Sequence, residues 1–252
     1  MRLSFAALAA LTLAACGQPE APPPLPEPAQ AATPAPWFIC DALSAPVVLV
    51  FNAPANGVTE VVQYDKPNGA LIQRTSYTLG AGDGAAGSIY TPLAQNGAEA
   101  GHVRQINSGM LENPASAYTP AYSSVRIGDR DIACRWIPRT RAFGFTGRRS
   151  FVVHEDADGD LIYTTYDFAT AAQAATIELS ENARTTAFSV EVRDGAETTN
   201  AEGAVFTFDN AGFRYVVTLH RDQTGTLAVS RNGEPVQEEP LIAFIQGDAA
   251  AE

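Results

Sequence analysis

Apolar residues in this chain recur in short runs that are separated by Gly, Asn, Asp and Pro. Val190 and Val192 alternate with polar residues, and Tyr215, Val217 and Leu219 repeat the same two-residue period. This period indicates β-strands with one buried face, and no sustained 3.6-residue period predicts a long helix. The strands expected from these runs are residues 45–52, 58–64, 70–79, 88–91, 123–127, 131–136, 150–155, 161–168, 187–193, 215–219 and 227–229.

Two stretches lack the strand pattern. Residues 92–122 hold small residues and few apolar ones, which predicts a long loop with one helical turn, and the alanine-rich residues 169–175 predict a short helix. Dipeptides such as Asn232-Gly233 are typical of tight hairpin turns. The fold class predicted is therefore mainly β and antiparallel, with two small barrel- or sandwich-like β units after a disordered tether.

A weak internal duplication favours two units. The segment Ala-Gly-Ser-Ile-Tyr-Thr at residues 86–91 is echoed by Glu-Gly-Ala-Val-Phe-Thr at residues 202–207, and an Asn-containing turn follows each. A single large barrel or sandwich would satisfy the same number of strands. The expected organisation is a first β unit at 37–138, an arginine-rich linker at 139–149, a second β unit at 150–247 and a tail at 248–252.

The N-terminal sequence indicates export. A basic start, an apolar run at residues 3–13 and small residues after it describe a signal peptide of residues 1–15, too short to span a bilayer as a helix. Leu13-Ala14-Ala15-Cys16 resembles the lipobox of bacterial lipoproteins. The resemblance implies that Cys16 becomes the mature N-terminus and carries three acyl chains, which at ~0.8 kcal/mol per buried CH₂ hold a protein on a membrane. Gly17 implies, by analogy with enterobacterial lipoproteins, the periplasmic side of the outer membrane of a Gram-negative bacterium.

A proline-rich tether follows at residues 16–36. Eight of the nineteen residues from Gln18 to Pro36 are proline, and most of the others are Ala, Glu and Gln. Such a segment cannot bury a core and is expected to be extended, at ~3.1 Å per residue. It would hold the folded part up to ~60 Å from the bilayer.

Charge and cysteine content narrow the function classes. The formal net charge of the 252 residues is -12, which argues against a nucleic-acid partner and is compatible with a basic protein partner. In an exported chain, Cys40 and Cys134 are expected to form a disulfide. A metal pair or a reactive thiol is the alternative, but no histidine lies near either cysteine, so the zinc signature is poor. The sequence predicts no cofactor and no metal site.

The densest charge contrast lies between the two expected β units. Five arginines interleaved with aromatic residues suggest an anion site, for a lipid A phosphate, peptidoglycan carboxylates or an acidic protein. The alternative is a linker whose arginines pair with the carboxylates of the protein itself. The candidate anion-binding residues are Arg135, Arg139, Arg141, Arg148 and Arg149.

No catalytic motif is present, and the chain is expected not to be an enzyme. The three histidines have no motif around them, and no Gly-x-Ser-x-Gly elbow occurs. Asp156, Asp158 and Asp160 suggest calcium, but the loop lacks the glycine and glutamate that an EF-hand needs at its sixth and twelfth positions, so a hairpin turn is the better interpretation. A hydrolase whose carboxylate pair is assembled only by folding stays open as an alternative.

A second resemblance concerns partners. Lipobox, Pro/Ala tether and a small acidic β domain bracketed by cysteines resemble the membrane-bound inhibitors of C-type lysozyme, small antiparallel barrels that insert a Ser-Gly-x-x-Tyr loop into the lysozyme cleft. The segment at 86–90 matches this loop without its serine, and the segment at 202–206 lacks both the serine and the tyrosine hydroxyl. The function expected is a non-catalytic, lipid-anchored envelope protein that binds a periplasmic or cell-wall-associated partner. The candidate partner loop is Gly87, Ser88, Ile89 and Tyr90.

Overall fold

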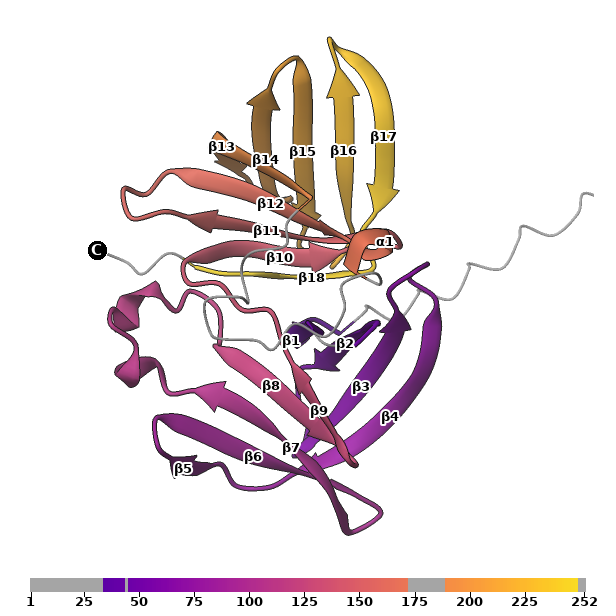
Figure 1. Ribbon diagram of the computed structural model, residues 1–252, viewed down its shortest axis with the longest axis vertical. Coiled ribbons are helices and arrows are strands. Elements are labelled where there is room, and N and C mark those ends of the chain that lie inside the picture. The colour runs from indigo at the N-terminus through magenta and orange to yellow at the C-terminus, as the bar shows by residue number, and fades with distance from the viewer. Residues whose placement is uncertain (1–33, 44, 172–188, 249–252) are drawn as a thin grey trace, which may run out of the picture. The chain divides into compact units, whose positions relative to one another are not determined.

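Two antiparallel sheets of nine strands each make up the fold (Figure 1). The computed structural model describes residues 34–43, 45–171 and 189–248. The prediction of a mainly β, antiparallel fold is confirmed. Strands of the first sheet are β1 (Pro36–Asp41), β2 (Val47–Asn52), β3 (Val58–Asp65), β4 (Leu71–Leu79), β5 (Asp83–Ala85), β6 (Ser88–Gln95), β7 (Ala98–Ile106), β8 (Tyr122–Ile127) and β9 (Arg130–Ala133).

The second sheet follows directly along the chain. Its strands are β10 (Thr140–Phe145), β11 (Arg149–Glu155), β12 (Leu161–Asp167), β13 (Val190–Thr199), β14 (Gly203–Asn210), β15 (Phe213–His220), β16 (Gly225–Arg231), β17 (Glu234–Pro240) and β18 (Ala243–Gln246). The described helical turns are η1 (Ser108–Met110), η2 (Pro114–Ser116) and α1 (Phe168–Ala171). Both sheets belong to one compact unit.

The two sheets share one strand order. Without the extra strand β5, the first sheet runs β1-β2-β3-β4-β6-β7-β8-β9, and without β18 the second runs β10 to β17 in sequence order. In this correspondence β6 matches β14, and the two echoed segments, 86–91 and 202–207, cover the starts of these two strands. The internal echo therefore coincides with equivalent positions in two like meanders.

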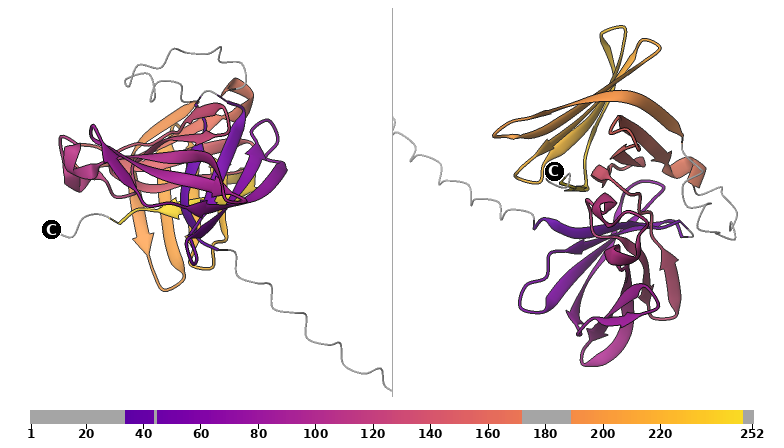
Figure 2. Two further views of the ribbon diagram at one scale, coloured as in Figure 1. Left: turned by 90° about the horizontal axis from the view of Figure 1, so that it is seen from below. Right: turned by 90° about the vertical axis from the view of Figure 1, so that its left-hand side faces the viewer.

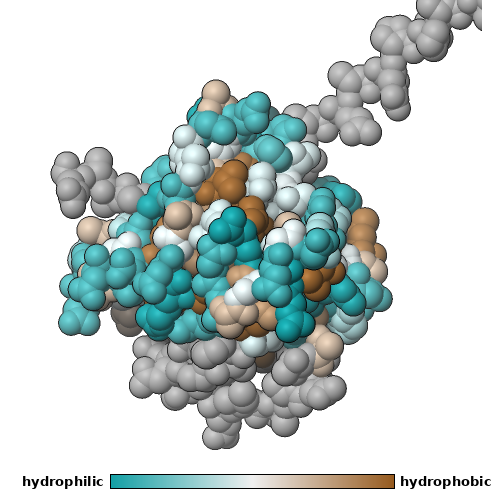
Figure 3. Space-filling model, turned by 90° about the horizontal axis from the view of Figure 1, so that it is seen from above, coloured by the Kyte–Doolittle hydropathy of each residue, from teal (hydrophilic) through white to brown (hydrophobic). Residues whose placement is uncertain are grey.

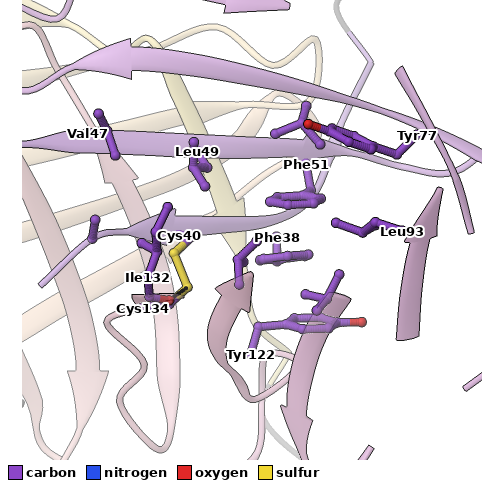
Figure 4. Close-up of a cluster of buried hydrophobic side chains, with 14 residues drawn as sticks. Phe38, Cys40, Val47, Leu49, Phe51, Tyr77, Leu93, Tyr122, Ile132 and Cys134 are labelled. Atoms are coloured by element: carbon purple, nitrogen blue, oxygen red, sulfur yellow. Dashed lines mark hydrogen bonds between the residues drawn. A yellow bond between two sulfur atoms is a disulfide. The ribbon is translucent and has the colours of Figure 1, made fainter. Parts of the chain in front are cut away.

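The first sheet curls until its two edge strands approach each other. Ala42, just after β1, forms a bridge with Cys134, just after β9, and the predicted Cys40–Cys134 disulfide is confirmed with a Cα–Cα distance of 4.7 Å. Inside the curl, the ring of Phe38 stacks between Phe51 and Tyr122, at centroid distances of 4.3 and 3.9 Å (Figure 4). Buried apolar side chains from all the strands but β5 fill the interior.

The second sheet encloses a separate core. Alternate residues of β14 to β16, among them Phe206, Phe208, Val217 and Leu227, point into it and are fully buried. The outward positions of the same strands are more exposed, as the period of two predicts. Seen from above, the surface of the molecule is largely hydrophilic, with hydrophobic side chains showing between hydrophilic ones (Figure 3).

The sheets pack through the outer faces of corresponding strands, β1 to β3 against β10 to β12 (Figure 2). Val48, Val50 and Val62 of the first sheet share a buried cluster with Phe145 and Val152 of the second. These strands are consequently buried on both faces, which explains why residues 47–51 form a continuous apolar run rather than an alternating one.

Two sequence-based expectations about this region are wrong. Residues 92–122 are not one long loop, because β6 extends to Gln95 and β7 occupies Ala98–Ile106. Although β7 is poor in apolar residues, strands on both sides satisfy its backbone. Residues 139–149 are not a linker either, because β10 and the start of β11 lie there. Every residue from 142 to 146 is buried, but the arginines on both sides of this run hide it in the sequence pattern.

Three other predictions extend outside the described residues. Of the expected helix at 169–175, residues up to 171 are described and are helical in α1. The first two residues of the expected strand at 187–193 and all but the first of the tail at 248–252 lie outside. The signal peptide, the lipobox and all but the last three residues of the tether at 16–36 also lie outside.

Candidate functional site

The predicted arginine site is divided among several partners. Arg141 binds Glu155 and Glu197, with N–O distances of 2.7 and 2.6 Å. Arg149 binds Asp167 and Glu239, at 3.3 and 3.5 Å. These two arginines therefore hold strands of the second sheet together through the carboxylates of the protein itself.

The other three arginines also do not converge on a common anion site. Arg135 is buried and binds Asp41, and the guanidinium of Arg139 donates to the backbone carbonyl of Asp156. Arg148 is exposed and makes no ion pair with any described residue. The geometry favours the interpretation that most of these arginines are internal partners.

A buried charge cluster joins the two sheets, and no local motif marks it. The carboxylate of Asp41 in β1 forms an ion pair with Lys66 Nζ at 2.6 Å and accepts hydrogen bonds from Arg135 Nε at 2.8 Å and from Ser150 Oγ of β11 at 2.6 Å. Burial by itself would raise the pKa of Asp41, but the two cations lower that pKa well below its usual range. The guanidinium of Arg135 also stacks on the Tyr166 ring, 3.3 Å from its centroid.

This cluster holds a serine and a lysine but is not a nucleophilic site. Ser150 is fully buried and Lys66 is 4% exposed, so no substrate can reach either side chain. Lys66 Nζ additionally donates to the carbonyl of Ala42. We interpret the cluster as structural. Its members come from β1, from the β3–β4 turn, from the segment that follows β9 and from β11, and they hold these four segments together.

Folding also brings two carboxylates together on Arg149. Asp167 at the end of β12 and Glu239 in β17 each bind one end of this guanidinium. Glu239 further accepts from the hydroxyl of Thr146, which closes the far edge of the second sheet against the β10–β11 turn. The guanidinium occupies the space between the two carboxylates where the scissile bond of a glycoside would have to lie. The carboxylates of Asp167 and Glu239 therefore hold strands together through Arg149.

The candidate partner loop is mostly strand. Gly87 lies in the β5–β6 turn with a φ of +80°, whereas Ser88 is buried in β6 and accepts from Arg104 Nε at 2.9 Å. Ile89 and Tyr90 are half-buried, and the Tyr90 ring packs edge-on against His102. None of these four residues is exposed, so they do not form a projecting loop.

The aspartates at 156–160 form the hairpin turn that their spacing suggests. Asp156 Oδ1 accepts from the backbone N–H of Asp158 and Asp160, at 2.9 and 3.0 Å. Hydrogen bonds from the turn backbone hold the pKa of Asp156 below its usual value. Within the described ranges, no group of three or more His, Cys, Asp or Glu side chains is placed to bind a metal ion.

A further candidate site is a groove that sequence reasoning missed. It encloses about 370 Å³, within the range of ligand sites, and twelve residues line it. We call its lining from the start of β1 and the segment before β8 the first wall, and its lining from the start of β14, the end of β15 and the β15–β16 turn the second wall; β18 lines the groove as well. The lining residues are Ala35, Pro36, Trp37, Thr119, Pro120, Gly203, His220, Arg221, Gln223, Phe244, Ile245 and Gln246.

Backbone geometry builds the second wall. Gly203 has a φ of +156°, and a Cβ at this position would lie 1.9 Å from the carbonyl oxygen of Leu219, so only glycine fits. Arg221 N–H donates to the Glu202 carbonyl at 3.0 Å and ties the two turns together. The amide oxygen of Gln223 is buried without a hydrogen-bond partner among the described residues. The groove thus lies at the second of the two echoed segments, 202–207.

Comparison with protein-family models, with curated proteins and with solved structures gave no match. In the part of the chain that the structure describes, no helix is long and apolar enough to cross a membrane.

Proposed function

We propose that this chain is a non-catalytic, lipid-anchored binding protein of the bacterial envelope, held through Cys16 on the periplasmic face of the outer membrane. The disulfide-closed β fold supports export, because disulfides persist in oxidising compartments. The lipobox and the proline-rich stretch support anchoring at a distance from the bilayer. Its partner is a periplasmic or cell-wall-associated molecule and not a nucleic acid.

The observation that carries the binding role is the groove between β18 and the Gly203 turn. Five separate segments of the chain converge on it, and it combines apolar side chains such as Trp37 and Ile245 with the polar groups of His220 and Arg221. Sites of this composition and size bind ligands. The charged clusters elsewhere, around Asp41 and Arg149, are occupied by contacts within the protein.

Fractionation of cells that express the full chain tests the anchoring. The wild-type protein is expected in the outer-membrane fraction, with a mass that corresponds to loss of residues 1–15 and addition of three acyl chains. Cys16→Ser is expected to remain unprocessed or to become soluble, whereas Cys40→Ser, which keeps the lipobox, still carries the lipid. A Cys16→Ser protein that is still acylated and membrane-bound would disprove the assignment.

A further inference from the structure

The groove has an unpaired strand edge at its floor. β18 pairs with β10 on one side, and no second described strand pairs with it. Gly247 N–H donates to the carbonyl of Arg141, so Gly247 and Arg141 form a hydrogen-bonded pair. Two residues further along each strand, Ile245 lies opposite Phe143 in the same register. Because hydrogen-bonded and non-bonded pairs alternate in an antiparallel ladder, the backbone N–H and C=O of Phe244 and Gln246 point away from β10.

The groove runs along β18. Its lining includes the three consecutive residues Phe244, Ile245 and Gln246. Side chains of consecutive strand residues point to opposite faces, so a cavity lined by all three reaches the backbone of β18 as well as its side chains. Phe244 belongs to the core of the second sheet and Ile245 to the cluster between the sheets, which fixes the strand in this orientation.

The charge of the groove differs from that of the whole chain. The sequence holds 28 acidic and 16 basic residues, yet none of the twelve lining residues is acidic and two of them are His220 and Arg221. The neighbouring Asp222 is exposed and its carboxylate accepts from the backbone N–H and the hydroxyl of Thr224, at 2.9 and 2.6 Å. The lining therefore complements a negatively charged ligand.

We propose that the groove binds an extended, acidic peptide segment of a partner protein, which adds as a strand to the free edge of β18. The backbone of Phe244 and Gln246 would supply the ladder hydrogen bonds, as in other cases of strand addition. Trp37 and Pro120 on one wall receive an apolar side chain, and His220 and Arg221 on the other receive a carboxylate. This inference rests on the proposed binding function and names the class of its partner.

The test uses a fluorescent, end-capped synthetic peptide, Thr-Val-Asp-Val-Thr-Val, and the full chain purified in detergent. Fluorescence anisotropy is expected to report saturable binding, and the amides of Phe244 and Gln246 are expected to exchange hydrogen more slowly in the complex. The same peptide N-methylated at alternate residues should bind on the order of tenfold more weakly for each ladder bond lost. Equal binding of the N-methylated peptide, or no binding at ~1 mM, would overturn the proposal.

Two matched variants locate the site. Gln246→Pro removes an outward N–H and leaves the bonds to β10 in place, so it should weaken binding on the order of tenfold, whereas Gln246→Ala keeps this N–H and should lose less binding than Gln246→Pro. Arg221→Glu should weaken binding of the Asp peptide and strengthen that of a Lys peptide. Binding that is unchanged in both Gln246→Pro and Arg221→Glu would overturn the proposed site. If Gln246→Pro does not fold, the N-methylated peptide still decides.

Two further outcomes separate this inference from its alternatives. A dimer of the free protein that Gln246→Pro converts to a monomer would show that a second copy occupies the edge, and would overturn the partner peptide. Because the peptide test is made on purified protein, it does not depend on acylation of Cys16. Failure of the Cys16→Ser prediction would remove the anchor from the proposed function and leave the groove untouched.

Discussion

Replacing Asp41 with asparagine tests the charge cluster that joins the two sheets. Asparagine keeps the size of the side chain and can still accept from Ser150, but it breaks the ion pair with Arg135 and leaves the ammonium of Lys66 buried without the counter-charge of Asp41. Asp41 is 1% exposed, and Lys66 and Arg135 are 4% and 8% exposed. Breaking a buried ion pair by removing one partner costs about 3–5 kcal/mol. We therefore expect Asp41→Asn to lower the free energy of unfolding by at least about 3 kcal/mol.

Urea unfolding of the full chain in detergent, with the disulfide intact, measures this loss. The matched control is Asp209→Asn, which breaks the exposed pair of Asp209 and Arg214 and should change stability little, because solvent screens such pairs. Adding Lys66→Met to Asp41→Asn should recover part of the loss, since one uncompensated cation is removed. A loss below about 1 kcal/mol for Asp41→Asn, or no difference from the control, would refute the reasoning.

Three other predictions concern pH, the disulfide and the groove. Because the pKa of Asp41 is lowered in the folded state, the stability that it contributes is complete above its unfolded pKa of about 4 and is lost as the pH falls below that value; the urea midpoint of wild type should fall in this range more steeply than that of Asp41→Asn. Replacing both Cys40 and Cys134 with alanine opens a loop with a sequence separation of 94 residues and should lower the free energy of unfolding by about 4–5 kcal/mol, and an unchanged urea midpoint would contradict the role of the disulfide. Gly203→Ala should destabilise the protein more than Gly57→Ala, where a Cβ meets nothing within 4 Å and only the positive φ opposes the change; equal thermal midpoints would show that the wall of the groove is not tightly packed.

Sequence patterns predicted the β fold because strand formation depends on local periodicity. Alternation at positions such as Val217 and Leu219 and the turn at Asn232-Gly233 mark strand and hairpin independently of what packs on them. The pairing of Cys40 with Cys134 also followed from the sequence, by elimination once Cys16 was assigned to lipid. The weak echo at 86–91 and 202–207 was informative for the same reason, since both copies begin a strand after a glycine turn.

Tertiary structure alone decided where the charges and the site lie. The sequence from Arg135 to Arg149 reads the same whether its arginines face solvent or carboxylates. Only folding brings Asp41 to Arg135 and Glu239 to Thr146, and each of these pairs is more than ninety residues apart in the sequence. The groove could not be predicted from the sequence either, because its twelve lining residues come from segments spread from Ala35 to Gln246. Period and turn chemistry act over a few residues, whereas a buried ion pair or a free strand edge depends on which distant segments the packed sheets place side by side.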